Sequence, residues 1–313
     1  NIIDFLDNLS GLIFREKKIK DYPDLATFAF FCRKSNIYSL KKKYSNFLDN
    51  RYGRGLVLHF TPSNVPLNFA YSLLFGLITG NTNIVRLSDN FHTQETLLIK
   101  NINNLLKKKF RKLQNKINLI RYKKSEDITA FLSSICDVRV IWGGDHSVNE
   151  IRKQPLSPEA YDVTFADRYS ICLVSAKNYL GAGSFDKEAI AFYNDTMVFD
   201  QNACTSPKIV LWHGNIKDIN KAKFIFWKKF NKIVNTKNYK TKGNLNYEKL
   251  YKQTKAIIDL NLKKEKEAKS IVKKINIKKI PKNLDQYLSS GGFFIEFNFK
   301  RFNEIKNLFS SKI

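Results

Sequence analysis

From Gly55 onward, short apolar and β-branched runs alternate with longer stretches of helical period, and no other feature of the chain restricts its fold as strongly. This alternation is typical of βα units around a mainly parallel sheet. Strands are predicted at residues 56–60, 84–87, 117–121, 138–142, 170–174, 209–212 and 293–297. Helices are predicted at residues 3–13, 25–31, 67–77, 94–110, 126–135 and 185–199, then in Lys-rich stretches up to about residue 282 and briefly at the end. The pattern predicts a doubly wound α/β fold.

The chain is long enough for two domains, because its 313 residues exceed the ~100–200 residues of a typical domain. Hydrophobic residues make up 43% of it, which excludes a disordered chain. The longest apolar stretch, residues 65–79, is shorter than the ~20 residues that a membrane-spanning helix needs, and it contains Asn68 and Ser72. No membrane span is expected.

The chain is strongly basic, with 54 Lys and Arg against 28 Asp and Glu and a formal net charge of +26. Such a charge attracts polyanions, including nucleic acids and phosphate-bearing cofactors. However, Lys, Asn and Ile are all abundant, as A/T-rich codons would produce, and no nucleic-acid-binding signature accompanies the basic residues. We therefore expect solvated basic surfaces and no specific nucleic-acid partner.

The four cysteines, Cys32, Cys136, Cys172 and Cys204, are widely spaced, with no Cys-x-x-Cys and no paired Cys/His spacing. Neither a metal site nor a disulfide scaffold is indicated. The expected location is a reducing compartment, the cytoplasm. The histidines lack a recurring acidic partner, and each of them, including His59 inside a predicted strand, is expected either to pack or to face solvent.

Several familiar active-site motifs are absent. There is no Walker A loop, no Gly-x-Ser-x-Gly elbow and no His-Glu-x-x-His. A Gly-x-Gly-x-x-Gly after a strand is also missing, because Gly53 and Gly55 precede their strand and cannot present amides to a pyrophosphate in the Rossmann manner.

Four short segments occur in a fixed order instead. They are residues 59–67 (HFTPSNVPL), 80–89 (GNTNIVRLSD), 141–145 (IWGGD) and 200–208 (DQNACTSPK). The order of these segments resembles that in the aldehyde dehydrogenase superfamily. Their amino-acid sequences resemble those of the acyl-CoA reductases of the bacterial luminescence type, which make long-chain fatty aldehyde. The resemblance implies an aldehyde-dehydrogenase-like fold with a Rossmann-like cofactor domain and an α/β catalytic domain.

Cys204 is the candidate nucleophile, standing between a predicted helix and a predicted strand among small and polar residues. A thiolate suits acyl transfer from another thioester, because the exchange costs little and leaves the carbonyl open to reduction. The alternative is a buried apolar cysteine, the reading kept for the other three.

Asn64 is the candidate oxyanion donor, because acyl transfer builds negative charge on the carbonyl oxygen. The resemblance places its side-chain amide beside the backbone N–H of Cys204. An ordinary N-cap asparagine is the alternative, since Asn64 follows a strand and precedes a predicted helix.

The resemblance also implies a nicotinamide cofactor. It places Thr61, Pro62 and Ser63 on the nicotinamide and ribose side, Arg86 on the adenosine side, and Gly143 and Gly144 near the pyrophosphate, and Ser88 is a further cofactor-binding candidate. Arg86 at a strand end also suits a phosphate physically, with a surface arginine as the alternative. NADPH is expected from the closest family. Asp89 would repel a 2′-phosphate, so NADH stays open.

The sequence departs from the wider superfamily at two places. Residues 164–170 (TFADRYS) place Phe165 where aldehyde-oxidising members have the glutamate that activates water, so the acyl-enzyme should persist long enough for reduction. Gln201 stands three residues before Cys204, where many dehydrogenases have it two before, so a different local loop is expected.

These observations predict an acyl-CoA or acyl-protein thioester reductase. Residues 1–163 would form N-terminal helices and a dinucleotide-binding domain, and residues 164–313 a catalytic domain incomplete at its C-terminus. Expected partners are an acyl-CoA or acyl-carrier-protein thioester and an acyl-protein synthetase, with self-association into a homo-oligomer allowed. The rival is a basic, non-catalytic module of the same fold that binds acyl donors, a partner protein or a polyanion.

Overall fold

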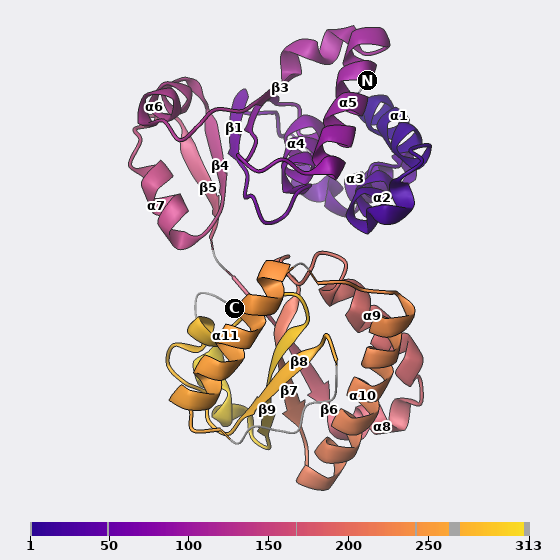
Figure 1. The fold of residues 1–313 in the computed structure, drawn as a ribbon. Helices are drawn as coiled ribbons and strands as arrows, with labels where there is room; N and C mark the ends of the chain where they lie inside the picture. Colours follow the sequence, from indigo (N-terminus) through magenta and orange to yellow (C-terminus); the bar gives the residue numbers. More distant parts are fainter. Residues whose placement is uncertain (1, 49, 167, 242, 263–269, 310–313) are drawn as a thin grey trace. The chain divides into compact units, whose positions relative to one another are not determined.

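The computed structural model describes residues 2–48, 50–166, 168–241, 243–262 and 270–309. The chain divides into two compact units, Asn1–Asp167 and Arg168–Ile313 (Figure 1). The predicted boundary after Val163 falls inside a strand of the first unit, where Thr164 pairs with Ile141 and Phe165 with Trp142. The division therefore comes later than expected. Asp167, in the sequence stretch beginning at Thr164, lies outside the described residues.

The first unit contains a five-stranded parallel sheet in the order β3-β2-β1-β4-β5. Its strands are β1 (Leu56–Phe60), β2 (Thr82–Arg86), β3 (Ile117–Ile120), β4 (Val138–Trp142) and β5 (Tyr161–Phe165). The chain leaves β1 in one direction for β2 and β3 and returns on the other side for β4 and β5. Crevices at the carboxyl ends of strands beside such a reversal are where open α/β sheets bind ligands.

Helices cover both faces of this sheet (Figure 1). They are α1 (Ile2–Phe14), α2 (Pro23–Phe31), α3 (Lys34–Leu48), α4 (Asn68–Ile78), α5 (Thr93–Lys108), α6 (Glu126–Ile135) and α7 (Asp145–Arg152). On one face, α1, α2, α4 and α5 form a core with Val85 and Ile117. On the other, α6 and α7 pack on Leu58 and Ile141. The alternating side chains of the strands thus supply two cores, as the doubly wound prediction requires.

Local sequence signals explain why several predicted boundaries are correct. The helix α6 begins where the Ser125 side chain accepts a hydrogen bond from the Ile128 backbone N–H, and Glu126 and Asp127 favour its first turn. The chain after α4 turns at Gly80, whose φ of +88° is a conformation that glycine adopts without strain.

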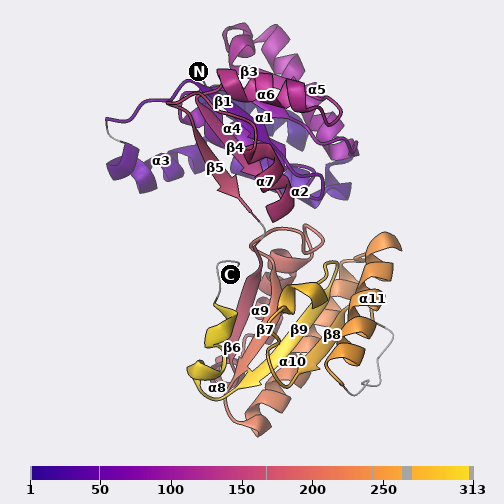
Figure 2. The ribbon, with the colours of Figure 1, turned by 90° about the vertical axis from the view of Figure 1, so that its left-hand side faces the viewer.

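The second unit contains a four-stranded parallel sheet in the order β6-β7-β9-β8. Its elements are β6 (Ser170–Ser175), α8 (Ala176–Ala182), α9 (Phe185–Thr196), β7 (Pro207–His213), α10 (Ile216–Thr236), α11 (Gly243–Asp259), β8 (Lys273–Ile277) and β9 (Phe293–Phe299). Figure 2 shows α10 running along this sheet. Aromatic side chains of α9, α10 and β9, including Phe192, Phe230 and Phe294, fill one core, and β7, β8 and β9 contribute to a second.

Two predictions for the end of the chain are wrong. The Lys-rich stretch was expected to be helical throughout, but β8 lies in it, with Ile275 and Ile277 buried and Asn276 exposed. The alternation of buried and exposed residues that is typical of a strand is hard to recognise here, because lysines surround these few residues in the sequence. In place of a final helix the structure has short 3-10 turns, Phe302–Glu304 and Lys306–Leu308.

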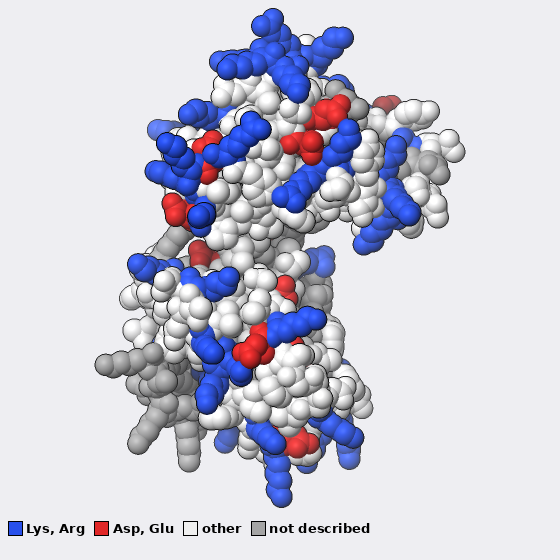
Figure 3. All heavy atoms as spheres, turned by 90° about the vertical axis from the view of Figure 1, so that its right-hand side faces the viewer, with Lys and Arg blue, Asp and Glu red and all other residues white. Residues whose placement is uncertain are grey.

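Lys and Arg side chains are spread over the surface of each unit on the face drawn in Figure 3, with fewer Asp and Glu between them. This distribution agrees with the expectation of solvated basic surfaces. Across the described ranges, no helix combines the length and the apolar composition that a membrane crossing requires.

Candidate active site

The carboxyl edge of the first sheet holds the predicted cofactor residues. Thr61 directly follows β1, Arg86 ends β2 and Gly143 directly follows β4. The Thr61 hydroxyl donates to the Arg86 carbonyl at 3.0 Å, which ties the ends of β1 and β2 together. The structure therefore brings Thr61 and Arg86 side by side.

Asn64 lies in the bend between β1 and α4, with an exposed side chain. The N-cap of α4 is Leu67, and no side chain caps that helix. The alternative role of Asn64 as an ordinary N-cap is therefore wrong. Pro62 is half-buried and Ser63 exposed in the same bend, and the Ser63 carbonyl accepts a hydrogen bond from His92 Nε2 at 3.2 Å.

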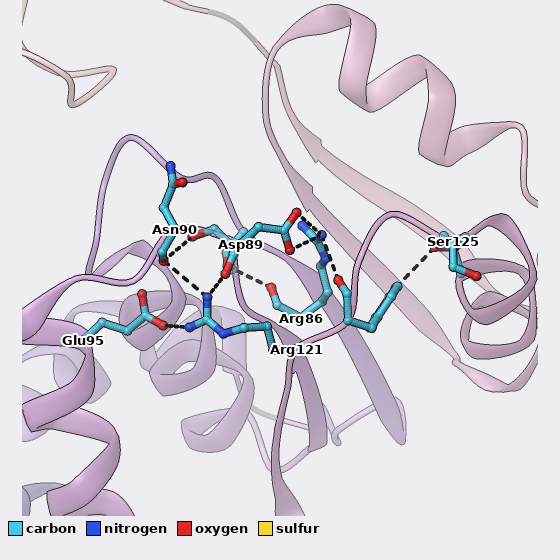
Figure 4. A network of polar contacts seen from close by, with 10 residues as sticks. Arg86, Asp89, Asn90, Glu95, Arg121 and Ser125 are labelled. Carbon is cyan, nitrogen blue, oxygen red and sulfur yellow. Dashed lines mark hydrogen bonds and ion pairs between the residues drawn. The ribbon is translucent and has the colours of Figure 1, made fainter. Parts of the chain in front are cut away.

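Arg86 is fixed in place by its neighbours. Its Nη2 donates to both carboxylate oxygens of Asp89, at 3.1 and 3.3 Å, and to the Tyr122 carbonyl at 3.2 Å (Figure 4). The guanidinium carbon lies 5.4 Å from the centroid of the Tyr122 ring. The Arg86 side chain is only 19% exposed, so Arg86 is not an ordinary surface arginine. A bound phosphate would contact a guanidinium that also forms an ion pair with Asp89.

Two further predicted cofactor positions shape the same edge. Ser88 is buried, and its hydroxyl donates to the Asn90 carbonyl at 3.3 Å, within the turn after β2. Gly144 is the N-cap of α7, and a Cβ on Gly143 would lie 3.3 Å from that of Ser147. Several hydrogen-bond donors therefore lie at one edge of the sheet: a guanidinium, hydroxyls at strand ends and the first backbone amides of α7. Together they fit the phosphates and sugars of a dinucleotide.

Of the two outcomes expected for His59, packing is the one observed, within a buried chain of hydrogen bonds. Trp142 Nε1 donates to Ser72 Oγ at 3.0 Å, and Ser72 Oγ lies 2.7 Å from His59 Nδ1. His59 Nε2 lies 3.0 Å from Asn83 Oδ1, and the Asn83 amide nitrogen donates to other carbonyls. His59 therefore carries its proton on Nε2 and accepts on Nδ1. Burial lowers the pKa of His59 to about 4, against the effect of the Asn83 hydrogen bond.

Phe165 lies at the end of β5, a strand that the sequence pattern did not predict, and it stacks on Trp142 with ring centroids 3.8 Å apart and an interplanar angle of 9°. Phe165 as a whole residue is 43% exposed. An aromatic side chain therefore occupies the position that the resemblance assigns to a water-activating glutamate, and it has no group that could accept a proton from water.

Cys204 lies in the second unit, on the turn between α9 and β7, and is exposed. Its carbonyl accepts a hydrogen bond from Ser170 Oγ at 2.8 Å. The other cysteines are less accessible: burial raises the pKa of Cys136 and of Cys172 to about 11 and raises that of Cys32 as well. Cys204 is thus the accessible thiol of the chain, and a buried packing role does not apply to it.

The turn that carries Cys204 is anchored by Gln201, whose side chain is completely buried. Its Nε2 donates to the carbonyls of Pro207 and Phe293, at 2.8 and 2.9 Å. Its Oε1 accepts from the backbone N–H groups of Gly292 and Phe293, at 3.0 Å each. One amide therefore joins the cysteine turn to the start of β9 and uses all four of its hydrogen-bonding positions.

The backbone of this turn is unusual at its start. Asp200 and Gln201 have φ values of 52° and 59°, a region that non-glycine residues seldom occupy. The Asp200 carboxylate accepts a hydrogen bond from the Tyr239 hydroxyl at 2.7 Å, and the Asp200 carbonyl accepts one from the Gly291 N–H at 2.8 Å. These contacts hold both residues in the left-handed conformation.

The candidate residues are divided between the two units. Asn64 and all predicted cofactor residues belong to the first, and Cys204 with its anchor Gln201 to the second. Sequence reasoning missed Arg121 and Tyr122, which hold the turn after β2 and Arg86, although their place at the carboxyl end of a predicted strand was a usable signal. Within the described residues, no group of three or more His, Cys, Asp or Glu side chains could hold a metal ion.

The fold is that of the aldehyde dehydrogenases. A solved 3,6-anhydro-L-galactose dehydrogenase in complex with NAP matches 97% of this chain and 70% of its own, with a TM-score of 0.67 and 12% identity. An NAD-dependent benzaldehyde dehydrogenase from Corynebacterium glutamicum matches 97% and 72%, with a TM-score of 0.64 and 11% identity. The chain is therefore an aldehyde-dehydrogenase-like α/β protein, as the resemblance implied.

Sequence comparison narrows this class. The family model for acyl-CoA reductase (LuxC) matches residues 37–275. The chain belongs to this family. Long-chain acyl-protein thioester reductase 2 of Photobacterium leiognathi is 26% identical over 169 residues, which are 53% of this chain and 34% of the relative. Long-chain acyl-protein thioester reductase of Aliivibrio fischeri is 24% identical over 165 residues, 52% of this chain and 33% of the relative. Each match thus spans about a third of the relative's length.

Proposed function

We propose that the chain acts as an acyl thioester reductase, which forms a long-chain fatty aldehyde through an acyl-cysteine intermediate. The exposed thiol of Cys204, on a turn anchored by the buried Gln201 amide, is the observation that carries the proposal. Family membership and the names of the two relatives support the substrate class, an acyl-CoA or a long-chain acyl-protein.

In the first step, the Cys204 thiolate attacks the thioester carbonyl carbon. The new carbon–sulfur bond to Cys204 forms and the bond to the carrier sulfur breaks. The carrier leaves as a thiolate, which takes up one proton from solvent in place of the proton that the Cys204 thiol released when it ionised. In this proposal the Asn64 side-chain amide and the Cys204 backbone N–H donate to the oxygen on which charge develops. An acyl group then remains on Cys204.

The second step is a two-electron reduction of the acyl-enzyme. A nicotinamide dinucleotide supplies the hydride when bound. The residues at the carboxyl edge of the first sheet would hold it: Arg86 and the amides of α7 bind phosphates, and Thr61 with Ser63 lies along the ribose. The thiohemiacetal on Cys204 then collapses, returning the thiolate and releasing the aldehyde. Phe165 activates no water, which keeps hydrolysis from competing.

NADPH is the proposed reductant, following the luminescence-type family, and NADH is the alternative. The structure adds an argument for the alternative, because Asp89 shares Arg86 and is itself 61% exposed at the side chain. Equilibrium binding of each dinucleotide to the protein distinguishes them. We also propose a cytoplasmic location, in keeping with an exposed thiol, and an acyl-protein synthetase as the source of acyl groups.

A mass-tagged long-chain acyl-CoA tests the covalent step. One acyl group should appear on Cys204, be removed by hydroxylamine and be absent from Cys204→Ala, with Cys172→Ala as the matched control that keeps the label. Label that persists in Cys204→Ala would reject the proposal. The rival, a non-catalytic binding module, draws support from the net charge of +26 and predicts that wild type and Cys204→Ala bind acyl donors equally without forming an adduct.

A further inference from the structure

The segment between β2 and α5 is held by one side chain from the neighbouring strand. Arg121, directly after β3, donates to the backbone carbonyls of Ser88 and Asn90 and to the carboxylate of Glu95 (Figure 4). Its guanidinium carbon lies 4.1 Å from the centroid of the Phe91 ring. A single guanidinium thus contacts this segment at three residues and also contacts Glu95 in the first turn of α5.

The contacts of Arg121 are charge-assisted hydrogen bonds in partly buried surroundings, and such bonds hold the backbone of this segment in one conformation. Glu95 is only 3% exposed, and the Arg121 side chain only 22%. Burial raises the pKa of Glu95, and the charge of Arg121 opposes this. Hydrogen bonds with an ionised partner in such surroundings are shorter and stronger than neutral ones. The planar fork of arginine can reach two carbonyls and a carboxylate at once, whereas a lysine ammonium cannot match this geometry.

The segment held by Arg121 carries the predicted adenosine side of the cofactor site. It contains Ser88 and also Asp89, which fixes Arg86. Tyr122, next to Arg121, accepts the other hydrogen bond of Arg86. The same segment reaches the turn after β1 through His92 and the Ser63 carbonyl. The residues after β3 therefore order both the segment and the guanidinium beside it.

We propose that Arg121 is a positioning residue for dinucleotide binding: it keeps the turn after β2 in the conformation that receives the adenosine half of the cofactor. The inference rests on the proposed reductase function and adds to it a residue outside the four recognised segments. Arg121 itself touches no thioester, and acyl transfer to Cys204 needs no dinucleotide. Its replacement should therefore weaken dinucleotide binding and leave acylation unchanged.

The experiment measures the two half-reactions separately in the protein and in Arg121→Lys. Dinucleotide affinity is followed by nicotinamide fluorescence, and acylation by the mass-tagged acyl group on Cys204. If the segment adopts its binding conformation about a tenth of the time without the fork, the apparent Kd rises about tenfold. Amide hydrogen exchange of residues 88–92 should accelerate in the same variant. Arg111→Gln is the matched control, since Arg111 is exposed in the first unit and contacts a helix carbonyl.

A second variant tests the inference in case Arg121→Lys does not fold. Arg121→Gln combined with Glu95→Gln removes both charges, so no buried carboxylate is left without its partner. The inference is overturned if folded Arg121→Lys and the double variant bind dinucleotide as tightly as the unsubstituted protein while Cys204 is acylated normally; the proposed function then stands. If the unsubstituted protein binds no dinucleotide, both the inference and the reductase proposal fail.

Discussion

At the scale of single residues, burial separates the side chains that can react from those that only pack. Cys204 is exposed, whereas the apolar surroundings of Cys136 and Cys172 raise their thiol pKa values to about 11. His59 has every polar atom of its ring engaged and its pKa lowered by burial. The sequence pointed to Cys204 through its small and polar neighbours together with the family resemblance of residues 200–208, whereas for His59 it left packing and solvent exposure open.

The Phe165 position determines how long an acyl-enzyme survives under the proposed mechanism. We expect Phe165→Glu to raise hydrolysis of acyl-Cys204 to free fatty acid by about tenfold, since a positioned carboxylate can take a proton from water. The measurement is fatty acid released without dinucleotide. Phe165→Gln has the same size and no base, so equal hydrolysis by the two variants would contradict the role given to this position.

The pKa of His59 predicts how stability depends on pH. Between about 6.5, its ordinary value, and the folded value of about 4, the unfolded chain binds a proton that the folded chain does not. The free energy of unfolding should therefore fall as the pH is lowered through this window, by up to about 3 kcal/mol from this residue. Urea unfolding of the protein and of His59→Gln at pH 7 and pH 5 measures it. Identical pH dependence in both would show that His59 does not contribute.

At the scale of elements, the chain's short connecting turns are fixed by residues far away in sequence. The cysteine turn depends on Gly292 and Phe293 at the start of β9, and the turn after β2 depends on Arg121 after β3. Strand and helix positions follow from local periodicity, so most were predicted within a few residues. The hydrogen bonds of Gln201 and Arg121 join different βα units, and no local pattern contains them.

We expect the Gln201 side chain to contribute strongly to the stability of the second unit. Gln201→Leu removes the four hydrogen bonds that the buried Gln201 amide makes to two carbonyls and two N–H groups, and we expect the free energy of unfolding to fall by about 3 kcal/mol or more. Acylation of Cys204 should slow as well, because its turn loses its anchor. Chemical denaturation and acylation rates measure the two effects. The control is Gln286→Leu, an exposed glutamine of the same unit; a similar loss there would argue against a specific role for Gln201.

At the scale of the whole molecule, each unit has a parallel sheet and hydrophobic cores of its own. The chain belongs to the acyl-CoA reductase (LuxC) family. In the proposed chemistry, the first unit carries the cofactor residues and the second unit carries the nucleophile. Independent cores allow the two units to unfold in separate steps.

Dinucleotide should therefore stabilise one unit more than the other. At a concentration of about 100 times Kd, the unit that binds it gains about 2.7 kcal/mol. Differential scanning calorimetry should show two transitions, of which only one moves to higher temperature with dinucleotide. Gln201→Leu should lower the other. If both transitions shift together with the ligand, the division of roles between the units is wrong.

The sequence by itself determined the class of fold, the family resemblance and the choice of Cys204, because strand and helix periods and short motifs are properties of neighbouring residues. Only the tertiary structure decided that Leu67 takes the N-cap position of α4 without a side-chain cap, that β8 lies in the Lys-rich stretch, and that Gln201 and Arg121 hold the turns that carry candidate residues. Those outcomes depend on buried polar groups finding partners across the sheets, and such pairings exist only after distant segments have packed together.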